Sequence, residues 1–298
     1  MKLHFKITVL LITLLVLVSC SAPKKTISKE QPIKELVKDS IVKIKGTVGT
    51  IPPPPKPSVV IEDNYETEVC DGYHGNNLVE KFNHAIFNEL LNNHVSKEGE
   101  TDYKGFIKNK IVFKSYLASL SENMPTEEWS KEDILAYWMN TYNAFTIKLI
   151  IDNYPTKSIK DIKNAWDSRF FKLGNKWYNL SDIEHKILRK MDDPRIHFGI
   201  NCASFSCPPL LNRAFTTENV HKELDFLAHQ FINDKTRNTI SENNIQLSKI
   251  FQWYAKDFKT EGSLIDYLNK YSDITIQSNA KKKYKKYDWN LNEAHNGH

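Results

Sequence analysis

The chain of 298 residues carries 41 lysines and arginines against 36 aspartates and glutamates, which gives a formal net charge of +5. This mild excess does not favour nucleic-acid binding, which usually comes with a strongly basic surface. The ten glycines are scattered singly and form no phosphate-binding loop, and the length is sufficient for a sizeable hydrophobic core. We therefore expect no nucleic-acid partner and no cofactor.

The first 19 residues have the pattern of a signal peptide. Lys2 and Lys6 precede an apolar run over residues 7–18, which is too short for a transmembrane helix and ends directly before Ser19 and Cys20. This pattern resembles a bacterial lipoprotein signal, in which the cysteine is lipidated and becomes the first residue of the mature chain. We expect palmitate on Cys20 and a lipid anchor in a cell-envelope membrane, with the protein facing the periplasm or the exterior. An ordinary signal peptide cut elsewhere is the alternative.

Residues 20–77 are predicted to be a tether between this anchor and the domain. They are mostly polar, and the proline-rich run over residues 51–57 favours a stiff polyproline II segment. Removal of the signal peptide deletes two lysines and no acidic residue, so the mature chain has a net charge of +3. The chain beyond the tether has the length of one domain, over residues 78–292, with a short tail at 293–298. Five lysines within residues 281–286 predict a solvated face or, alternatively, a contact with an anionic surface.

Three hydrophobic patterns predict helices in the first part of the domain, over residues 78–95, 103–120 and 130–153. The third pattern begins at Ser130, a suitable N-cap, with Asp133 in place of the usual glutamate of a capping box. Its apolar residues leave almost no polar face, which is typical of a buried helix. Asn140 and Asn143 nevertheless lie one turn apart on the same side. Because buried amides need partners, we expect them to act as structural clamps or as members of a site, Asn140 in binding and Asn143 in catalysis.

Turn and helix-cap signals predict the elements of the next segment, over residues 170–191. Gly174 and Asn175 stand between two short β-rich runs, which is the spacing of a two-residue hairpin. Ser181 and Glu184 then match a capping box that opens a helix to about residue 191. This match assigns Glu184 a capping role in preference to a catalytic one.

The apolar side chains over residues 196–200 alternate with others, which predicts a strand with His197 on the opposite face. Pro194 is equally compatible with a helix start. The prolines at the end of residues 201–209 predict a loop. Later patterns predict helices over residues 217–232, 248–258 and 263–271, a hairpin over 238–247 and a last strand over 289–291. Helices are in the majority, so we expect a helix-rich single domain of the α+β class.

Reactive side chains are concentrated in residues 193–209, which contain His197, Asn201, Cys202, Ser204, Ser206 and Cys207. The segment belongs to a series of motifs at residues 138–144, 180–185, 193–198, 201–209, 247–254 and 287–292. Their order and residues resemble the motifs of an uncharacterised family, domain of unknown function 547, over residues 102–292. The family includes bacterial envelope lipoproteins, so the resemblance supports the domain limits and the lipid anchor, but it implies no reaction.

Three kinds of chemistry remain open for this segment. In the first, Cys202 is a nucleophile of a hydrolase or acyl transferase, with His197 or His185 as its base and Asn143 as an orienting group. Asn140, Asn201, Ser204, Ser206 and Cys207 would then contribute to binding. In the second, His185, His197 and both cysteines bind zinc, although their spacing gives this little support.

In the third, Cys202 and Cys207 form a structural disulfide in the oxidising envelope and the domain is a non-enzymatic binding or scaffold module. Cys70 in the tether would then be the unpaired thiol. In every case we expect a pocket formed by the helix of Asn140 and Asn143, by His185 and by residues 196–207.

Overall fold

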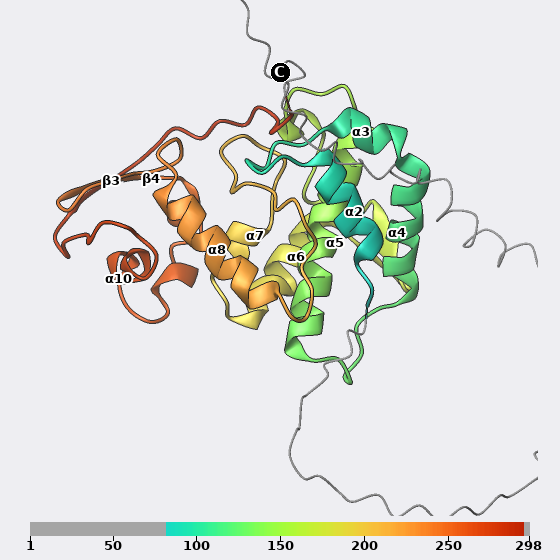
Figure 1. Ribbon diagram of the computed structural model, residues 1–298, viewed down its shortest axis with the longest axis horizontal. Coiled ribbons are helices and arrows are strands. Elements are labelled where there is room, and N and C mark those ends of the chain that lie inside the picture. The colour runs from blue at the N-terminus through green and yellow to red at the C-terminus, as the bar shows by residue number, and fades with distance from the viewer. Residues whose placement is uncertain (1–81, 295–298) are drawn as a thin grey trace, which may run out of the picture. The chain divides into compact units, whose positions relative to one another are not determined.

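The computed structural model describes residues 82–294 (Figure 1). Helices dominate, and short strands form a two-stranded and a three-stranded sheet, which confirms the predicted helix-rich α+β class. The predicted signal peptide, Cys20, the tether with Cys70 and the beginning of the first predicted helix lie outside the described residues. Within them, no helix combines the length and the hydropathy that crossing a bilayer requires.

The first helices are α2 (Ala85–His94), α3 (Tyr103–Lys108) and α4 (Lys110–Glu122). Helix α2 begins at Ala85, whose N–H donates to the Asn83 side chain at 2.8 Å, and the predicted start at residue 78 lies outside the described residues. The predicted second helix is two helices, which was not expected. The break falls at Asn109, whose side chain donates to the Gly105 carbonyl and contacts the His94 ring, an arrangement that competes with regular helix.

The central element is α5 (Lys131–Asp152), most of whose residues are buried. Both hydrogen bonds of the predicted capping box are present: the Asp133 N–H donates to Ser130 Oγ at 3.0 Å, and the Ser130 N–H donates to the Asp133 carboxylate at 3.3 Å. The buried helix and its cap are therefore confirmed. Helix α5 packs against α3, α4, α6 and α8.

After the short 3₁₀ helix η1 (Ile159–Asp161), strands β1 (Phe171–Leu173) and β2 (Lys176–Tyr178) form the predicted antiparallel hairpin. Gly174 has a φ of 53° at its turn, where glycine avoids steric strain. Helix α6 (Leu180–Lys186) and the 3₁₀ helix η2 (Leu188–Met191) come next in the chain.

The predicted capping box at Ser181 and Glu184 is wrong. The N-cap of α6 is Asn179, whose side chain accepts from the Asp182 N–H at 2.6 Å. Asparagine is a strong N-cap and precedes Ser181 in the chain, so the helix begins earlier and Glu184 takes no part in capping. This correction leaves the Glu184 carboxylate available for other contacts.

The strand predicted over residues 196–200 is also wrong, and the helical alternative holds. Residues Ile196–Gly199 form the short helix α7, in which the Ile200 N–H donates to the Ile196 carbonyl at 3.0 Å. All four residues of α7 are buried. A helix that is buried on all sides needs no polar face. The alternation of apolar side chains over residues 196–200 therefore could not distinguish a strand from a helix.

The rest of the domain comprises α8 (Val220–Asn233), β3 (Thr239–Ile240), β4 (Asn244–Leu247), α9 (Ile250–Trp253), the 3₁₀ helix η3 (Asp257–Lys259), α10 (Leu264–Asn269) and β5 (Lys281–Tyr284). The hairpin of β3 and β4 is confirmed, and the predicted helix over residues 248–258 is divided between α9 and η3. The lysine-rich segment forms β5, parallel to β4, which the sequence did not predict.

Residues 289–291 make isolated bridges instead of a strand: Asn290 pairs with Ser158, and Leu291 pairs with Ser204. The Leu291–Ser204 bridge and the hydrogen bond from the Phe205 N–H to the Asn290 carbonyl at 2.7 Å hold residues 290–291 against the loop at residues 201–209. Figure 1 shows α2 to α5 in one half of the described chain, the strands β3 and β4 with α10 in the other, and α6 and α7 between them. The reactive segment therefore lies at the centre of the domain.

Candidate functional site

Asn140 and Asn143 are clamps between α5 and other parts of the chain. Asn140 binds both backbone groups of Phe215, donating to its carbonyl at 2.8 Å and accepting from its N–H at 3.0 Å. Asn143 donates to the Gly199 carbonyl at 2.9 Å and accepts from the Asn201 N–H at 2.9 Å. Both side chains are buried, and these bonds satisfy backbone groups that would otherwise lack partners.

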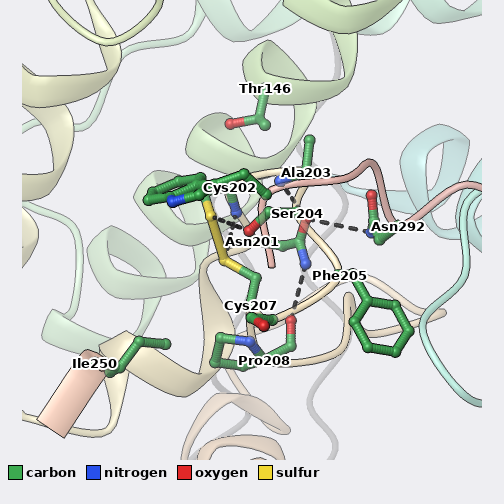
Figure 2. The surroundings of a disulfide bond; sticks show 12 residues. Thr146, Asn201, Cys202, Ala203, Ser204, Phe205, Cys207, Pro208, Ile250 and Asn292 are labelled. Atoms are coloured by element: carbon green, nitrogen blue, oxygen red, sulfur yellow. Dashed lines mark hydrogen bonds between the residues drawn. A yellow bond between two sulfur atoms is a disulfide. The ribbon is translucent and has the colours of Figure 1, made fainter. Parts of the chain in front are cut away.

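The loop at residues 201–209 is folded around the side chain of Asn201. Its amide donates to the Pro208 carbonyl at 2.8 Å and its oxygen accepts from the Ala203 N–H at 2.7 Å. Asn292 donates to the same oxygen at 3.4 Å, as Figure 2 shows. Ala203 has a φ of 58°, a left-handed conformation that these hydrogen bonds maintain.

Cys202 and Cys207 form a disulfide across this loop, with their Cα atoms 6.2 Å apart. Ser204 Oγ lies 3.0 Å from the Cys202 sulfur, and Figure 2 shows the phenyl ring of Phe205 directed away from the disulfide. Arg237 donates to the carbonyls of Phe205 and Cys207 at 2.8 and 2.9 Å. The loop is thus closed by a covalent bond and held by a guanidinium.

A cavity of about 500 Å³ lies beside the disulfide. Six of its lining residues are aromatic: Tyr142, Trp166, Trp253, Tyr254, Tyr287 and Trp289. The polar and sulfur-bearing residues that line it are Asp167, Ser181, Glu184, His185, His197, Cys202 and Cys207. Ile200, Pro208 and Ile250 complete the wall. Ligand sites in proteins commonly have this size and this mixture of aromatic walls with a few polar groups.

His197 is held rigidly in the wall of this cavity. Its Nε2 lies 2.8 Å from the Asp257 carboxylate, and its ring stacks on Tyr254 with centroids 3.9 Å apart. Arg189 donates two hydrogen bonds of 2.7 Å to the same carboxylate. The bonds from His197 and Arg189 hold the pKa of Asp257 well below its usual range. The His197 Nδ1 atom is buried and has no hydrogen-bond partner among the described residues.

Glu184 is the buried carboxylate of the cavity. It accepts hydrogen bonds from the hydroxyls of Tyr254 and Tyr142, the latter at 3.2 Å. Burial, together with the charge of Glu184, raises the pKa of both tyrosines, which therefore remain hydroxyl donors. His185 is more exposed, with Nδ1 3.8 Å from a Glu184 oxygen and 3.4 Å from an Arg189 nitrogen.

Three rings form an aromatic cluster, which consists of Trp253, Tyr287 and Trp289. Their ring centroids are 4.5 to 5.7 Å apart, and Trp166 meets Trp289 edge-on at 5.9 Å. Although α9 and residues 287–289 are distant in sequence, the parallel pairing of β4, which precedes α9, with β5, which precedes Tyr287, brings them together. Trp253 is 47% exposed, so its indole also borders solvent.

The structure brings only part of the predicted site together. The four residues His185, His197, Cys202 and Cys207 line one cavity, as expected. Asn140, Asn143, Asn201, Ser204 and Ser206 do not line it; Ser206 accepts from the Asp288 N–H at 2.8 Å, and the others brace the surrounding backbone and loop. For the two α5 asparagines this agrees with the expected clamp role.

Sequence reasoning missed the partners of the imidazoles. Glu184 was assigned to a cap that does not exist, and Asp257 lies 60 residues beyond His197 with no local pattern that points to it. The aromatic cluster could have been suspected, since Trp253, Tyr287 and Trp289 all stand within the motifs of the sequence.

This geometry does not support the two reactive alternatives for the cysteines, a zinc site and a cysteine nucleophile. Within residues 82–294, no group of three or more histidine, cysteine or acidic side chains is arranged to hold a metal ion. In the same part of the chain no hydrogen bond joins either sulfur to an imidazole, and a disulfide sulfur is not a thiolate nucleophile.

The fold and the site define a helix-rich α+β domain with an aromatic cavity beside a disulfide-closed loop. Residues 126–232 match the model of the family described as protein of unknown function, DUF547. The match contains α5, α6, α7 and the disulfide loop, and it supports the family resemblance in this part of the chain. No curated protein and no solved structure matches the chain significantly.

Proposed function

We propose that this domain binds a small molecule in its aromatic cavity, as the ligand-binding part of a lipid-anchored protein of the cell envelope. The observation that carries the proposal is the cavity itself. Its volume of about 500 Å³, its six aromatic side chains and its few buried polar groups are the properties of a small-molecule site.

The disulfide supports binding in preference to cysteine chemistry. Asn201, Arg237 and the Cys202–Cys207 bond hold the loop at residues 201–209 in one conformation. A rigid wall reduces the entropy that ligand binding would otherwise cost. In the oxidised protein the cysteines therefore shape the cavity and do not attack a substrate.

Ligand binding is tested by tryptophan fluorescence, because three of the six tryptophans line the cavity. The full chain with Cys20→Ser is titrated with a panel of cationic, neutral and anionic small molecules. We expect at least one compound to quench or shift the emission, and Trp253→Ala to weaken its binding by about tenfold or more.

Trp177→Ala is the matched control, because Trp177 is similarly exposed, at 54%, and does not line the cavity. It should leave the affinity unchanged. The proposal is abandoned if no compound in the panel binds, or if Trp253→Ala and Trp177→Ala have the same effect.

The anchor is proposed from the sequence, in which Lys2, Lys6 and an apolar run precede Cys20. Expression in a bacterial host with an alkyne analogue of palmitate should label the protein and recover it with the membranes. Cys20→Ser should lose both the label and the membrane association, whereas Cys70→Ser should retain them. Equal labelling of the two variants would contradict the anchor.

A cysteine-dependent hydrolase or acyl transferase is the second candidate, and the pair of buried His197 and half-buried Asp257 favours it. A carboxylate on one imidazole nitrogen with the other nitrogen unpartnered among the described residues is the arrangement of a general base. This candidate requires reduction of the disulfide, which frees Cys202. After reduction, alkylation of Cys202 below pH 7 should be fast, and His197→Ala should slow it; slow alkylation in both proteins would remove the candidate.

A further inference from the structure

We infer that the ligand of the cavity is a small organic cation, a quaternary ammonium or a protonated amine that also carries a hydroxyl group. The inference rests on the proposed binding function and names its ligand class. It combines the charge of the lining, the faces of the aromatic rings and one unpartnered nitrogen.

The ionisable lining of the cavity is acidic in a chain that is basic as a whole. Asp167 and Glu184 line it, and among the described lining residues none is a lysine or arginine, although the chain has 41 of them. The guanidinium of Arg189 packs over Tyr254, but its charge is paired with Asp257. His185 and His197 also line the cavity, and His185 Nδ1 lies 3.8 Å from a Glu184 oxygen, so a cation entering the cavity meets two carboxylates and no lysine or arginine of the lining.

Glu184 retains capacity for a ligand. Each of its oxygens accepts one hydrogen bond from a tyrosine, and a carboxylate oxygen has a second lone pair. Because the residue is only 4% exposed, its charge is poorly screened by water and attracts a cation strongly.

The aromatic walls favour the same kind of ligand. The face of a tryptophan or tyrosine ring attracts ammonium groups, and clusters of such rings bind quaternary ammonium ions. The cluster of Trp253, Tyr287 and Trp289 supplies three such rings beside the acidic groups. The Lys160 ammonium lies 5.2 Å from the centroid of Trp289 and already takes part of that ring, so the ligand cation is assigned to the rings of Trp253 and Tyr287.

The imidazole of His197 indicates a further group on the ligand, one that forms a hydrogen bond with the ring. Nε2 of His197 is bound to Asp257, and its Nδ1 is buried in a residue that lines the cavity and has no described partner. A buried ring nitrogen without a partner is costly, and a ligand hydroxyl, which can both donate and accept, satisfies it in either tautomer. An amine with a hydroxyl group, as in choline or ethanolamine, carries both features.

The test compares choline with 3,3-dimethylbutan-1-ol, its neutral isostere, by isothermal titration of the unreduced full chain with Cys20→Ser. We expect choline to bind about tenfold or more tightly than the isostere, since only the cation gains from the rings and Glu184. Glycerophosphocholine, which adds a phosphate, should bind more weakly than choline, because the described lining offers no lysine or arginine to the phosphate. This arm distinguishes a free organic cation from a lipid headgroup.

Glu184→Gln should weaken choline binding about tenfold and leave the isostere unchanged. Glu223→Gln is the matched control, as Glu223 is also buried but pairs with Arg213 away from the cavity. If Glu184→Gln fails to fold, Asp167→Asn provides the second variant, because Asp167 is exposed and should tolerate the change. It should weaken choline binding by about threefold.

Equal binding of choline and its isostere, or unchanged choline binding in both variants, overturns the inference. Such a result is separate from failure of the proposed function. If a neutral or anionic compound of the fluorescence panel binds in a Trp253-dependent manner while choline does not, the binding function stands and the cation is wrong.

Discussion

Two groups of buried polar side chains in this domain differ in how completely they are satisfied. Asn140 and Asn143 are the clamps of α5, and each binds backbone groups with both the oxygen and the nitrogen of its side-chain amide. In the cavity, His197 has one ring nitrogen bound and the other without a described partner. Glu184 is bound by two hydroxyls and lines the cavity with one lone pair of each oxygen unused.

The difference separates structural polar groups from those available to a ligand. A fully bonded amide stabilises the fold and has no capacity left for a small molecule. A rigid group with an unused lone pair in a cavity costs stability until a ligand binds it. The comparison thus predicts large stability effects at the clamps and large binding effects, with small stability effects, at the cavity.

The largest loss of stability is expected at the clamp. Asn140→Ala leaves the buried N–H and carbonyl of Phe215 without partners and should lower the free energy of unfolding by about 3 kcal/mol. Urea denaturation measures the change. Asn123→Ala, at an exposed asparagine that donates to the Ser119 carbonyl, should cost less than about 1 kcal/mol. Similar losses in both variants would contradict the clamp.

Replacement of the disulfide should have the next largest effect. Cys202→Ser with Cys207→Ser removes a cross-link between residues five apart, for which loop closure predicts a loss of about 2 kcal/mol. The loss should appear in urea denaturation without reductant. Cys70→Ser serves as the control, and a stability of the double variant equal to that of the control would show that the disulfide does not stabilise the domain.

Acidification below neutral pH should destabilise the protein through His84. Burial lowers the pKa of its imidazole to about 3, against about 6.5 when unfolded, so the unfolded state binds more protons between these values. Stability is therefore full above pH 6.5 and falls as the pH drops toward 3, by about 1 kcal/mol between pH 6.5 and 5.5.

His84→Asn should flatten this part of the pH profile, as asparagine retains a hydrogen bond for the Tyr116 hydroxyl without an ionisable ring. Parallel profiles of the parent protein and His84→Asn, measured by denaturation at each pH, would assign the slope to another group.

The smallest stability effect is expected at the cavity. Trp253→Ala removes a half-exposed indole and should change the free energy of unfolding by less than about 1 kcal/mol, while it weakens ligand binding by about tenfold or more. Thermal and urea denaturation would detect a larger loss of stability. Such a loss would mean that the aromatic cluster holds the fold together and would remove the contrast with the clamps.

Local patterns determined several elements correctly. Ser130 and Asp133 cap α5 as predicted, because a capping box involves only residues within one turn. The turn at Gly174 and Asn175 likewise depends on the conformations of adjacent residues. The apolar composition of α5 predicted its burial, and the amides within it were expected to clamp other parts of the chain.

Where two local sequence signals predict different structures, the tertiary structure determines which of them forms. Asn179 and Ser181 are both good caps, and the position of α6 selected the first, which released Glu184 for the cavity. The segment at residues 196–200 fits a strand or a helix, and complete burial of α7 made its apolar pattern uninformative. The lysine-rich β5 forms a strand because β4 offers it a parallel edge.

By itself the sequence determined the fold class, the main buried helix and the segment that contains His197, Cys202 and Cys207. Only the tertiary structure decided that the two sulfurs join and that Asp257 orients His197 from 60 residues away. It alone placed Trp253 and Trp289 in the cavity that Glu184 also lines. The reason is physical: caps and turns depend on neighbouring residues, whereas a cavity is formed by side chains whose proximity depends on packing of the whole domain.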